Sequence, residues 1–251
     1  ANAGPVFRHM EFCRQCLWPE LDVNLISTTD GWAQFAVAGP NARKLLQKVV
    51  DPEHDITNEA FPFMACAELT ICGGTKARLF RISFSGELAF EIAVPARYGD
   101  SLMRVLMAVG EEFDVVPYGT EALGVMRIEK GHAAGNELTG QTSAANLGMG
   151  RMVSKKKDCI GNTLSERPDL NRDDGLRLVG FKPVNRVETL TSGAHFIALG
   201  KSAVMDNDEG WMSSVTFSPE LGHSIGIGFI KQGSERLGEV VRAVDLVRGK
   251  D

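Results

Sequence analysis

The sequence lacks the features that mark membrane spans, secretion signals and nucleic-acid binding. No apolar run reaches the roughly 18 residues that a membrane-spanning helix needs. Residues 1–5 carry neither the basic region nor the apolar core of a signal peptide. The 27 basic and 32 acidic residues give a formal net charge of −5, whereas a nucleic-acid binder presents a basic surface. We therefore expect a cytoplasmic protein with neither a membrane nor a nucleic acid as its partner.

Cysteine is also scarce. The five cysteines are an odd number in a chain of 251 residues, a length that does not depend on disulfides for its stability. Cys13 and Cys16 form a CxxC pair in an expected helix, but a zinc site needs about four ligands, and we expect neither a second pair nor a histidine partner. The five histidines are dispersed along the chain. We therefore expect no metal site.

The first 153 residues predict an α+β domain, because segments with helical spacing of apolar residues are interleaved with segments in which apolar residues alternate. We expect helices over residues 5–17, from 40, from 95 and over 118–130, and strands over 23–27, 32–37, 65–72, 77–84 and 88–94. This order of elements favours an antiparallel sheet with helices on one face.

A polar stretch separates this domain from a β-rich C-terminal part. Residues 154–175 contain three consecutive lysines and an almost wholly polar segment, and we expect them to form a connecting helix or linker. Residues 176–251 predict a β-barrel domain. We expect its strands at residues 176–181, 194–197, 202–206, 211–217, 225–229 and 239–244. Gly226 and Gly228 lie inside an apolar strand, which indicates close packing of backbones.

Glu129 is the residue whose position most needs an explanation. It lies near the expected C-terminal end of a helix, where the helix dipole disfavours a carboxylate. One interpretation is an exposed charge that pairs with Lys130 or Arg127. The other is a carboxylate that accepts two hydrogen bonds from one edge of a flat nitrogen heterocycle.

Several segments, taken in order, resemble motifs of the glycine-cleavage T-protein (aminomethyltransferase) family. Residues 81–92, RISFSGELAFEI, are similar to its R-x-x-Y-x-G-E segment, and residues 119–131, GTEALGVMRIEKG, to its R-[LI]-E-x-G helix. Residues 210–229, GWMSSVTFSPELGHSIGIGF, resemble its strand pair with a central S-P. Weaker matches are AGP at 38–40 and KDCIG at 157–161. The resemblance implies an aminomethyltransferase-like folate-binding fold, with antiparallel sheets, helices and a C-terminal β-barrel.

Residues 135–142 and 147–157 resemble most the sarcosine oxidase α-subunit branch of this family, and residues 193–196 support the same branch. This resemblance implies a tetrahydrofolate-binding domain that captures the one-carbon unit from oxidative demethylation of N-methylglycine as 5,10-methylenetetrahydrofolate. It also implies a hetero-oligomer with other sarcosine oxidase subunits, and flavin and NAD held in other parts of the enzyme. We do not expect the isolated chain to carry out the oxidation.

The resemblance also bears on the ends of the chain. The family places its catalytic aspartate upstream of the helix that begins here near Pro5, and this chain has no matching residue. We therefore assign no catalytic residue. The sequence stops at Asp251 within an expected strand, so we expect the family unit to be incomplete at both ends.

Four residues are predicted to bind folate because they match family positions. Glu129 matches the glutamate that holds the pterin ring. Phe84 stands where the family has tyrosine, so a ring contact can persist but a phenolic hydrogen bond cannot. Arg186 lies near a family arginine that faces the acidic tail of folate, although a surface arginine fits this position equally well. Tyr118 is a further candidate for the same pocket.

Two other functions within the family remain open. One is a stand-alone aminomethyltransferase that acts on a lipoyl-carrier protein. The other is a non-catalytic folate-binding protein of the branch that assists iron–sulfur assembly, which carries a K-G-C-[FY]-x-G-[QE] loop. Here Asp158 replaces the glycine and Asn162 leaves the final position of the loop unmatched. We interpret Cys159 as a small buried apolar residue in place of the usual phenylalanine. A scaffold whose folate pocket has decayed is the non-enzymatic alternative.

Overall fold

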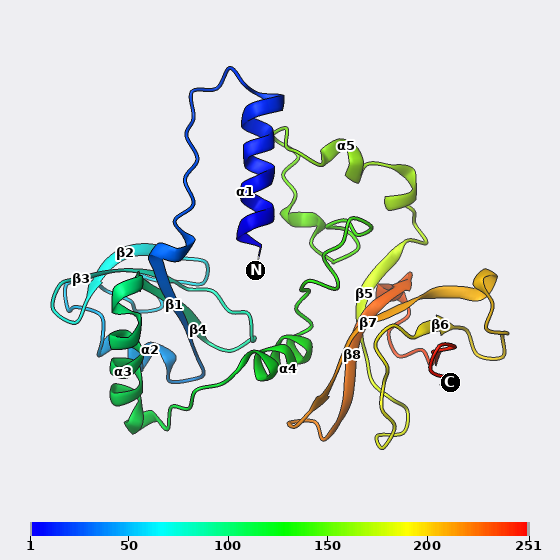
Figure 1. Ribbon diagram of the computed structural model, residues 1–251. Helices are drawn as coiled ribbons and strands as arrows, with labels where there is room; N and C mark the ends of the chain where they lie inside the picture. Colours follow the sequence, from blue (N-terminus) through cyan, green and yellow to red (C-terminus); the bar gives the residue numbers. More distant parts are fainter. Residues whose placement is uncertain (1, 250–251) are drawn as a thin grey trace. The chain divides into compact units, whose positions relative to one another are not determined.

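The computed structural model describes residues 2–249, which divide into two compact units, Ala1–Pro117 and Tyr118–Asp251 (Figure 1). This division differs from the sequence-based one, which assigned residues 118–153 to the first domain. Helix α4 (Thr120–Lys130) belongs to the C-terminal unit because it packs on the strands of that unit. Its buried Ile128 forms an apolar cluster with Ile225 and Ile227.

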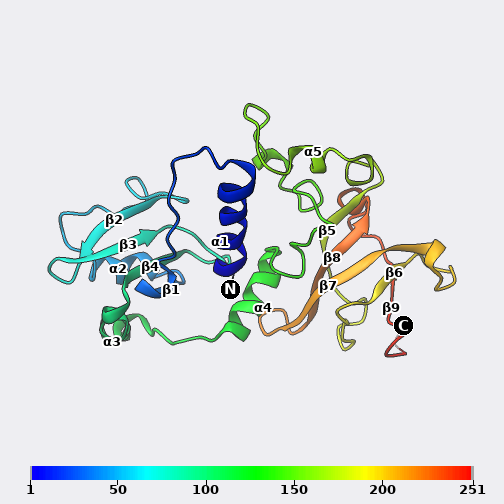
Figure 2. The same ribbon diagram turned by 45° about the horizontal axis from the view of Figure 1, so that its top comes forward.

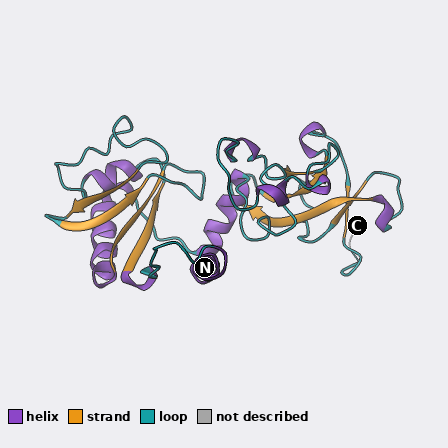
Figure 3. Cartoon of the chain, turned by 90° about the horizontal axis from the view of Figure 1, so that it is seen from above, coloured by secondary structure: helices purple, strands orange, loops and turns teal. Residues whose placement is uncertain are grey.

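The N-terminal unit is built on a four-stranded antiparallel sheet of order β1-β4-β3-β2. The strands are β1 (Trp32–Ala38), β2 (Cys66–Ile71), β3 (Thr75–Phe80) and β4 (Ala89–Pro95). Helices α2 (Ala42–Gln47) and α3 (Gly99–Gly110) contact each other and the sheet through β1 and β4 (Figures 1 and 3). The apolar core between them includes the fully buried side chains of Leu46, Leu79, Phe90 and Ile92.

The first residues of this unit confirm one sequence prediction and correct another. The predicted helix over residues 5–17 is α1 (Ala3–Phe12), which continues as a π-helical turn over Cys13–Leu17. The predicted strand over 23–27 is wrong, because this segment has no strand pairing and Ile26 is 83% exposed. Apolar and β-branched residues favour a strand locally, but a pairing partner decides whether one forms.

The C-terminal unit is built on a five-stranded antiparallel sheet of order β5-β8-β7-β6-β9 (Figure 2). The strands are β5 (Leu176–Phe181), β6 (His195–Ile197), β7 (Asp208–Ser218), β8 (His223–Lys231) and β9 (Arg242–Val244). The long hairpin of β7 and β8 is its centre, and every residue of β8 except the last is buried. Helix α4 lies against these two strands.

Short helices occupy many of the connections. They comprise α5 (Asn162–Ser165) and 3₁₀ helices at Thr29–Gly31, Ala96–Tyr98, Glu111–Phe113, Gly150–Met152, Pro168–Leu170, Met205–Asn207 and Gly233–Glu235. The helix at Met205–Asn207 replaces the predicted strand over 202–206. Here the Asn207 side-chain amide donates to the carbonyl of Ser202 at 2.9 Å and closes a turn. The predicted strand over 239–244 is shorter than expected because Glu239 is held by Arg236 in a preceding turn.

Gly228 shows why the centre of the C-terminal sheet uses glycine. A Cβ added at this position would lie 2.5 Å from the carbonyl oxygen of Trp211 and 2.9 Å from Cα of Met212. Both atoms belong to the backbone of β7, which cannot move without breaking the hairpin pairing. The close backbone packing expected from the sequence at this glycine is thereby confirmed.

We predict that Gly228→Ala destabilises the protein by about 1–3 kcal/mol, because the added methyl overpacks the contact with β7. The matched control is Gly180→Ala on β5, where the added Cβ would meet its nearest atom only at 4.0 Å. The free energy of unfolding is measured by urea denaturation of both variants. Equal stabilities of the two variants would contradict this packing argument.

Candidate functional site

Glu129 lies in the last turn of α4, which ends because Gly131 adopts a left-handed conformation with φ of 75°. A carboxylate at this end of a helix faces the negative pole of the dipole and needs a compensating donor. The Ser218 hydroxyl, at the end of β7, supplies it by donating to Glu129 Oε1 at 2.5 Å. Glu129 itself is exposed, whereas Ser218 is fully buried. The carboxylate is therefore accessible to a ligand, while one of its oxygens accepts a hydrogen bond from a buried hydroxyl.

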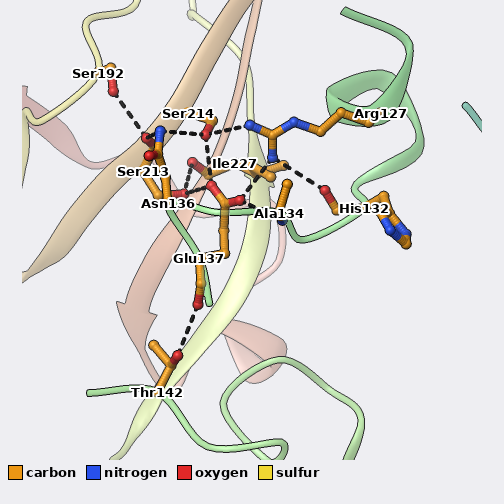
Figure 4. A network of polar contacts seen from close by, with 10 residues as sticks. All are labelled: Arg127, His132, Ala134, Asn136, Glu137, Thr142, Ser192, Ser213, Ser214 and Ile227. Atoms are coloured by element: carbon orange, nitrogen blue, oxygen red, sulfur yellow. Dashed lines mark hydrogen bonds and ion pairs between the residues drawn. The ribbon is translucent and has the colours of Figure 1, made fainter. Parts of the chain in front are cut away.

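Beside Glu129, a buried ion pair joins α4 to the loop that follows it and to β7 (Figure 4). Arg127 Nη1 donates to Glu137 Oε2 at 2.8 Å, and its Nη2 donates to the Ser214 hydroxyl at 2.7 Å. Glu137 Oε1 accepts from the hydroxyls of Ser213 at 2.6 Å and Ser214 at 2.7 Å. The backbone N–H of Ala134 also donates to Glu137 Oε2, at 2.8 Å. Glu137 is 0% exposed, yet both of its oxygens are satisfied.

The electrostatics of this network favour an ionised Glu137. Burial raises the pKa of its carboxyl group, but hydrogen bonds from Ser213, Ser214 and the Ala134 backbone, together with the charge of Arg127, outweigh this effect. The net result is a pKa below the usual range of a glutamate. The pair is therefore charged at neutral pH and fixes the position of Arg127.

The last turn of α4 is attached to β7 at two separate points. Arg127 reaches Ser214, and Glu129 reaches Ser218, four residues further along the strand. At the rise of a β-strand these two points lie about 13 Å apart. Between them Ile128 is buried against β8. These contacts leave the helix end little freedom to rotate, so the Cα of Glu129 has a defined place.

The other predicted residues lie outside the last turn of α4. Tyr118 precedes α4, and the helix axis measures about 14 Å from Thr120 to Glu129. Arg186 is exposed in the loop that follows β5, and Phe84 lies in the N-terminal unit, with 37% of its surface exposed. The roles of Tyr118, Arg186 and Phe84 in folate binding stay predictions.

Three features of the site were not predicted from the sequence: Ser218, Glu137 and the inward-facing role of Arg127. From the sequence, Arg127 was expected only as a surface partner of Glu129. One local signal existed: two consecutive serines interrupt an otherwise apolar strand at Ser213 and Ser214, and buried hydroxyls need partners. The partners lie 76 or more residues earlier in the chain, which no local pattern indicates.

The cysteines differ from expectation in two respects. Cys13 has a histidine neighbour after all, since its Sγ lies 3.7 Å from His9 Nε2. Within the described residues, however, no group of three or more candidate ligands gathers to hold a metal ion. Cys159 is exposed and donates to Asn162 Oδ1 at 2.9 Å, so its interpretation as a buried apolar residue is wrong.

A cavity of the C-terminal unit lies apart from Glu129. Its volume is about 1010 Å³, and the residues that line it belong largely to β5, β9 and the segments that flank them. Both strands are edges of the sheet, each with one paired neighbour. Glu129 is not among the described residues that line this cavity.

No helix within residues 2–249 has the length and apolar character needed to cross a bilayer.

Comparison with known proteins assigns the family. The GCVT N-terminal domain model matches residues 1–157, and the model of the glycine cleavage T-protein C-terminal barrel domain matches residues 177–250. The chain therefore belongs to the glycine cleavage T-protein family. The fold agrees with that of the glycine cleavage system aminomethyltransferase T from Bartonella henselae, with a TM-score of 0.75 and 22% identity over 99% of this chain and 63% of that one. The predicted fold class is confirmed.

Within the family, the chain is similar to sarcosine oxidase subunit alpha. It is 47% identical to the protein of that name from Rhizobium meliloti (strain 1021) over 243 residues, 96% of this chain and 24% of the relative. The corresponding protein of Corynebacterium sp. (strain U-96) is 40% identical over 96% of this chain. An aminomethyltransferase of Rubrobacter xylanophilus is 30% identical over 86% of this chain and 54% of the relative. The chain thus spans about a quarter of the length of the sarcosine oxidase subunits.

We predict that acid destabilises the C-terminal unit partly through Glu137. Its lowered folded-state pKa means that the unfolded chain binds the proton more tightly, so this stability is present above the unfolded-state pKa and is lost as the pH falls through the folded-state value. Glu137→Gln should cost about 3–5 kcal/mol at neutral pH, because it leaves Arg127 buried without its counter-ion. The variant should also lose less stability than the wild type between about pH 6 and pH 3.

The measurement is hydrogen exchange of the β7 and β8 amides as a function of pH. The control is Glu121→Gln, which changes an exposed glutamate in the first turn of the same helix. Parallel pH curves for the wild type and Glu137→Gln would show that the ion pair does not contribute to acid sensitivity.

Proposed function

We propose that this chain is the tetrahydrofolate-binding part of a sarcosine oxidase-type enzyme, and that it captures the one-carbon unit from oxidative demethylation of N-methylglycine as 5,10-methylenetetrahydrofolate. Two observations support the substrate class: membership of the T-protein family and 47% identity to a sarcosine oxidase subunit alpha. The relatives are named as subunits, which supports a hetero-oligomer. Flavin and NAD then belong to other parts of that enzyme.

The binding proposal depends mainly on the position of the Glu129 carboxylate. This exposed carboxylate is held at one oxygen by a buried hydroxyl, and an ionised carboxylate offers about four acceptor sites. It can therefore still accept two N–H donors from one edge of a planar ring, such as the 2-amino and ring N–H edge of a pterin. The remaining acceptor sites of this carboxylate therefore suit the N–H edge of tetrahydrofolate.

The role of the chain is binding and orientation. When bound, tetrahydrofolate supplies the nucleophilic nitrogen that takes up the one-carbon unit. The residues of this chain hold the pterin through Glu129, on a helix end fixed by Arg127 and Ile128. Holding a nucleophile close to its reaction partner accounts for a large rate gain through proximity alone. Phe84, Tyr118 and Arg186 are proposed as further folate contacts.

We predict that Glu129→Ala weakens binding of 5-formyltetrahydrofolate by about 2–4 kcal/mol, or roughly 30- to 1,000-fold, because it removes a charge-assisted hydrogen-bonded pair. Isothermal titration calorimetry measures the affinity. The matched control is Glu121→Ala, which removes an exposed carboxylate from the other end of α4 and should bind like the wild type. Equal affinity of Glu129→Ala and the wild type would remove Glu129 from the site.

The same variant tests the one-carbon product in the assembled enzyme. With tetrahydrofolate present, Glu129→Ala should oxidise N-methylglycine at the wild-type rate but release formaldehyde in place of 5,10-methylenetetrahydrofolate. Unchanged yields of methylenetetrahydrofolate would refute the capture role. A wild-type protein that shows no saturable folate binding would refute the whole proposal and favour a decayed scaffold.

We predict that Cys159→Ser leaves folate affinity and the one-carbon product unchanged. Cys159 is exposed, and its thiol donates a hydrogen bond to Asn162, so a hydroxyl can replace it. In the alternative function, iron–sulfur assembly, the cysteine of the K-G-C loop matters and the substitution should abolish activity. A loss of function in Cys159→Ser with normal folate binding would favour that alternative.

A further inference from the structure

We propose that Ser218 is a positioning residue for Glu129, and that its hydroxyl holds the carboxylate in the orientation that meets the two-donor edge of the ligand. The inference rests on the proposed function, because it assumes that Glu129 binds the ligand. It adds a residue 89 positions away in the sequence, on a different element of the fold.

The position of Ser218 is determined by its surroundings. It is the last residue of β7, is 0% exposed and pairs with His223 at the start of β8. Its carbonyl accepts from the N–H of Gly222 at 2.9 Å, which closes the turn between the strands. The hydroxyl is therefore attached to a rigid part of the C-terminal sheet.

The two hydrogen bonds of Ser218 Oγ determine which of them uses the hydroxyl proton. A serine hydroxyl has one proton to donate and accepts through its lone pairs. The N–H of Leu221 donates to Ser218 Oγ at 3.1 Å, so this bond uses the hydroxyl as an acceptor. The hydroxyl therefore donates its proton to Glu129 Oε1, which lies 2.5 Å from Ser218 Oγ. The hydroxyl thus acts as a fixed donor aimed at one carboxylate oxygen.

The Arg127 side chain is directed to other partners than Glu129. Arg127, two residues before Glu129, points to Glu137 and Ser214. The Ser218 hydroxyl, in contrast, donates directly to Glu129 Oε1. An exposed glutamate samples several rotamers and loses this freedom when it binds a ligand. A fixed donor restricts the rotamers beforehand, which increases affinity through preorganisation.

The test is a double-mutant cycle on binding of 5-formyltetrahydrofolate, with Ser218→Ala, Glu129→Ala and the double variant. We expect Ser218→Ala to weaken binding roughly tenfold in the wild-type background and less than about twofold in the Glu129→Ala background. Ser218→Cys, which fills nearly the same volume with a weak donor, should weaken binding similarly. The matched control is Ser224→Ala, because Ser224 is a buried serine of β8 whose hydroxyl bonds Leu190 and Thr216. It should bind like the wild type.

Each other outcome has a distinct meaning. If Ser218→Ala weakens binding equally in both backgrounds, its role is only to close the hairpin and the inference is overturned. If Glu129→Ala weakens binding but neither Ser218 variant does, the inference fails while the proposed function stands. If Glu129→Ala binds like the wild type, the proposed function of Glu129 fails, and the inference fails with it.

Discussion

The buried pair of Arg127 and Glu137 is the interaction on which the rest of the C-terminal unit depends. Removing two charges from water is costly, and attraction alone does not offset the cost unless the remaining lone pairs and protons are also satisfied. Here Glu137 receives hydrogen bonds from one guanidinium, two serine hydroxyls and one backbone N–H. These donors come from the helix, the loop after it and the central strand, so the pair connects three segments at one point.

This pair explains how an exposed glutamate can have a defined position. The helix that carries Glu129 is short, and isolated helices of its length are marginal in water. Its last turn is instead fixed by Arg127 and by the apolar contacts of Ile128. The carboxylate then needs only one further contact, from Ser218, to be oriented. Such a site is suited to holding a flat polar ring, which is the role that we propose for it in folate binding.

The outcome of the sequence predictions follows a physical pattern. Segments with alternating or continuous apolar residues, such as 32–37, 88–94 and 225–229, were predicted correctly because their apolar side chains pack into the core of their own unit. The predicted strands at 23–27 and 202–206 were wrong. Their local preference for β-structure is real, but pairing with a neighbouring strand is a property of the fold and not of the segment.

By itself, the sequence determined the α+β class, the family and the place of Glu129 near a helix end, because these depend on spacing and on short motifs within continuous segments. Only the tertiary structure decided what surrounds that glutamate. Ser218 is 89 residues from Glu129, and Ser214 is 87 from Arg127. Hydrogen bonds between such distant groups leave no periodic trace in the chain, and they form only once the helix has packed on the strand that carries the serines.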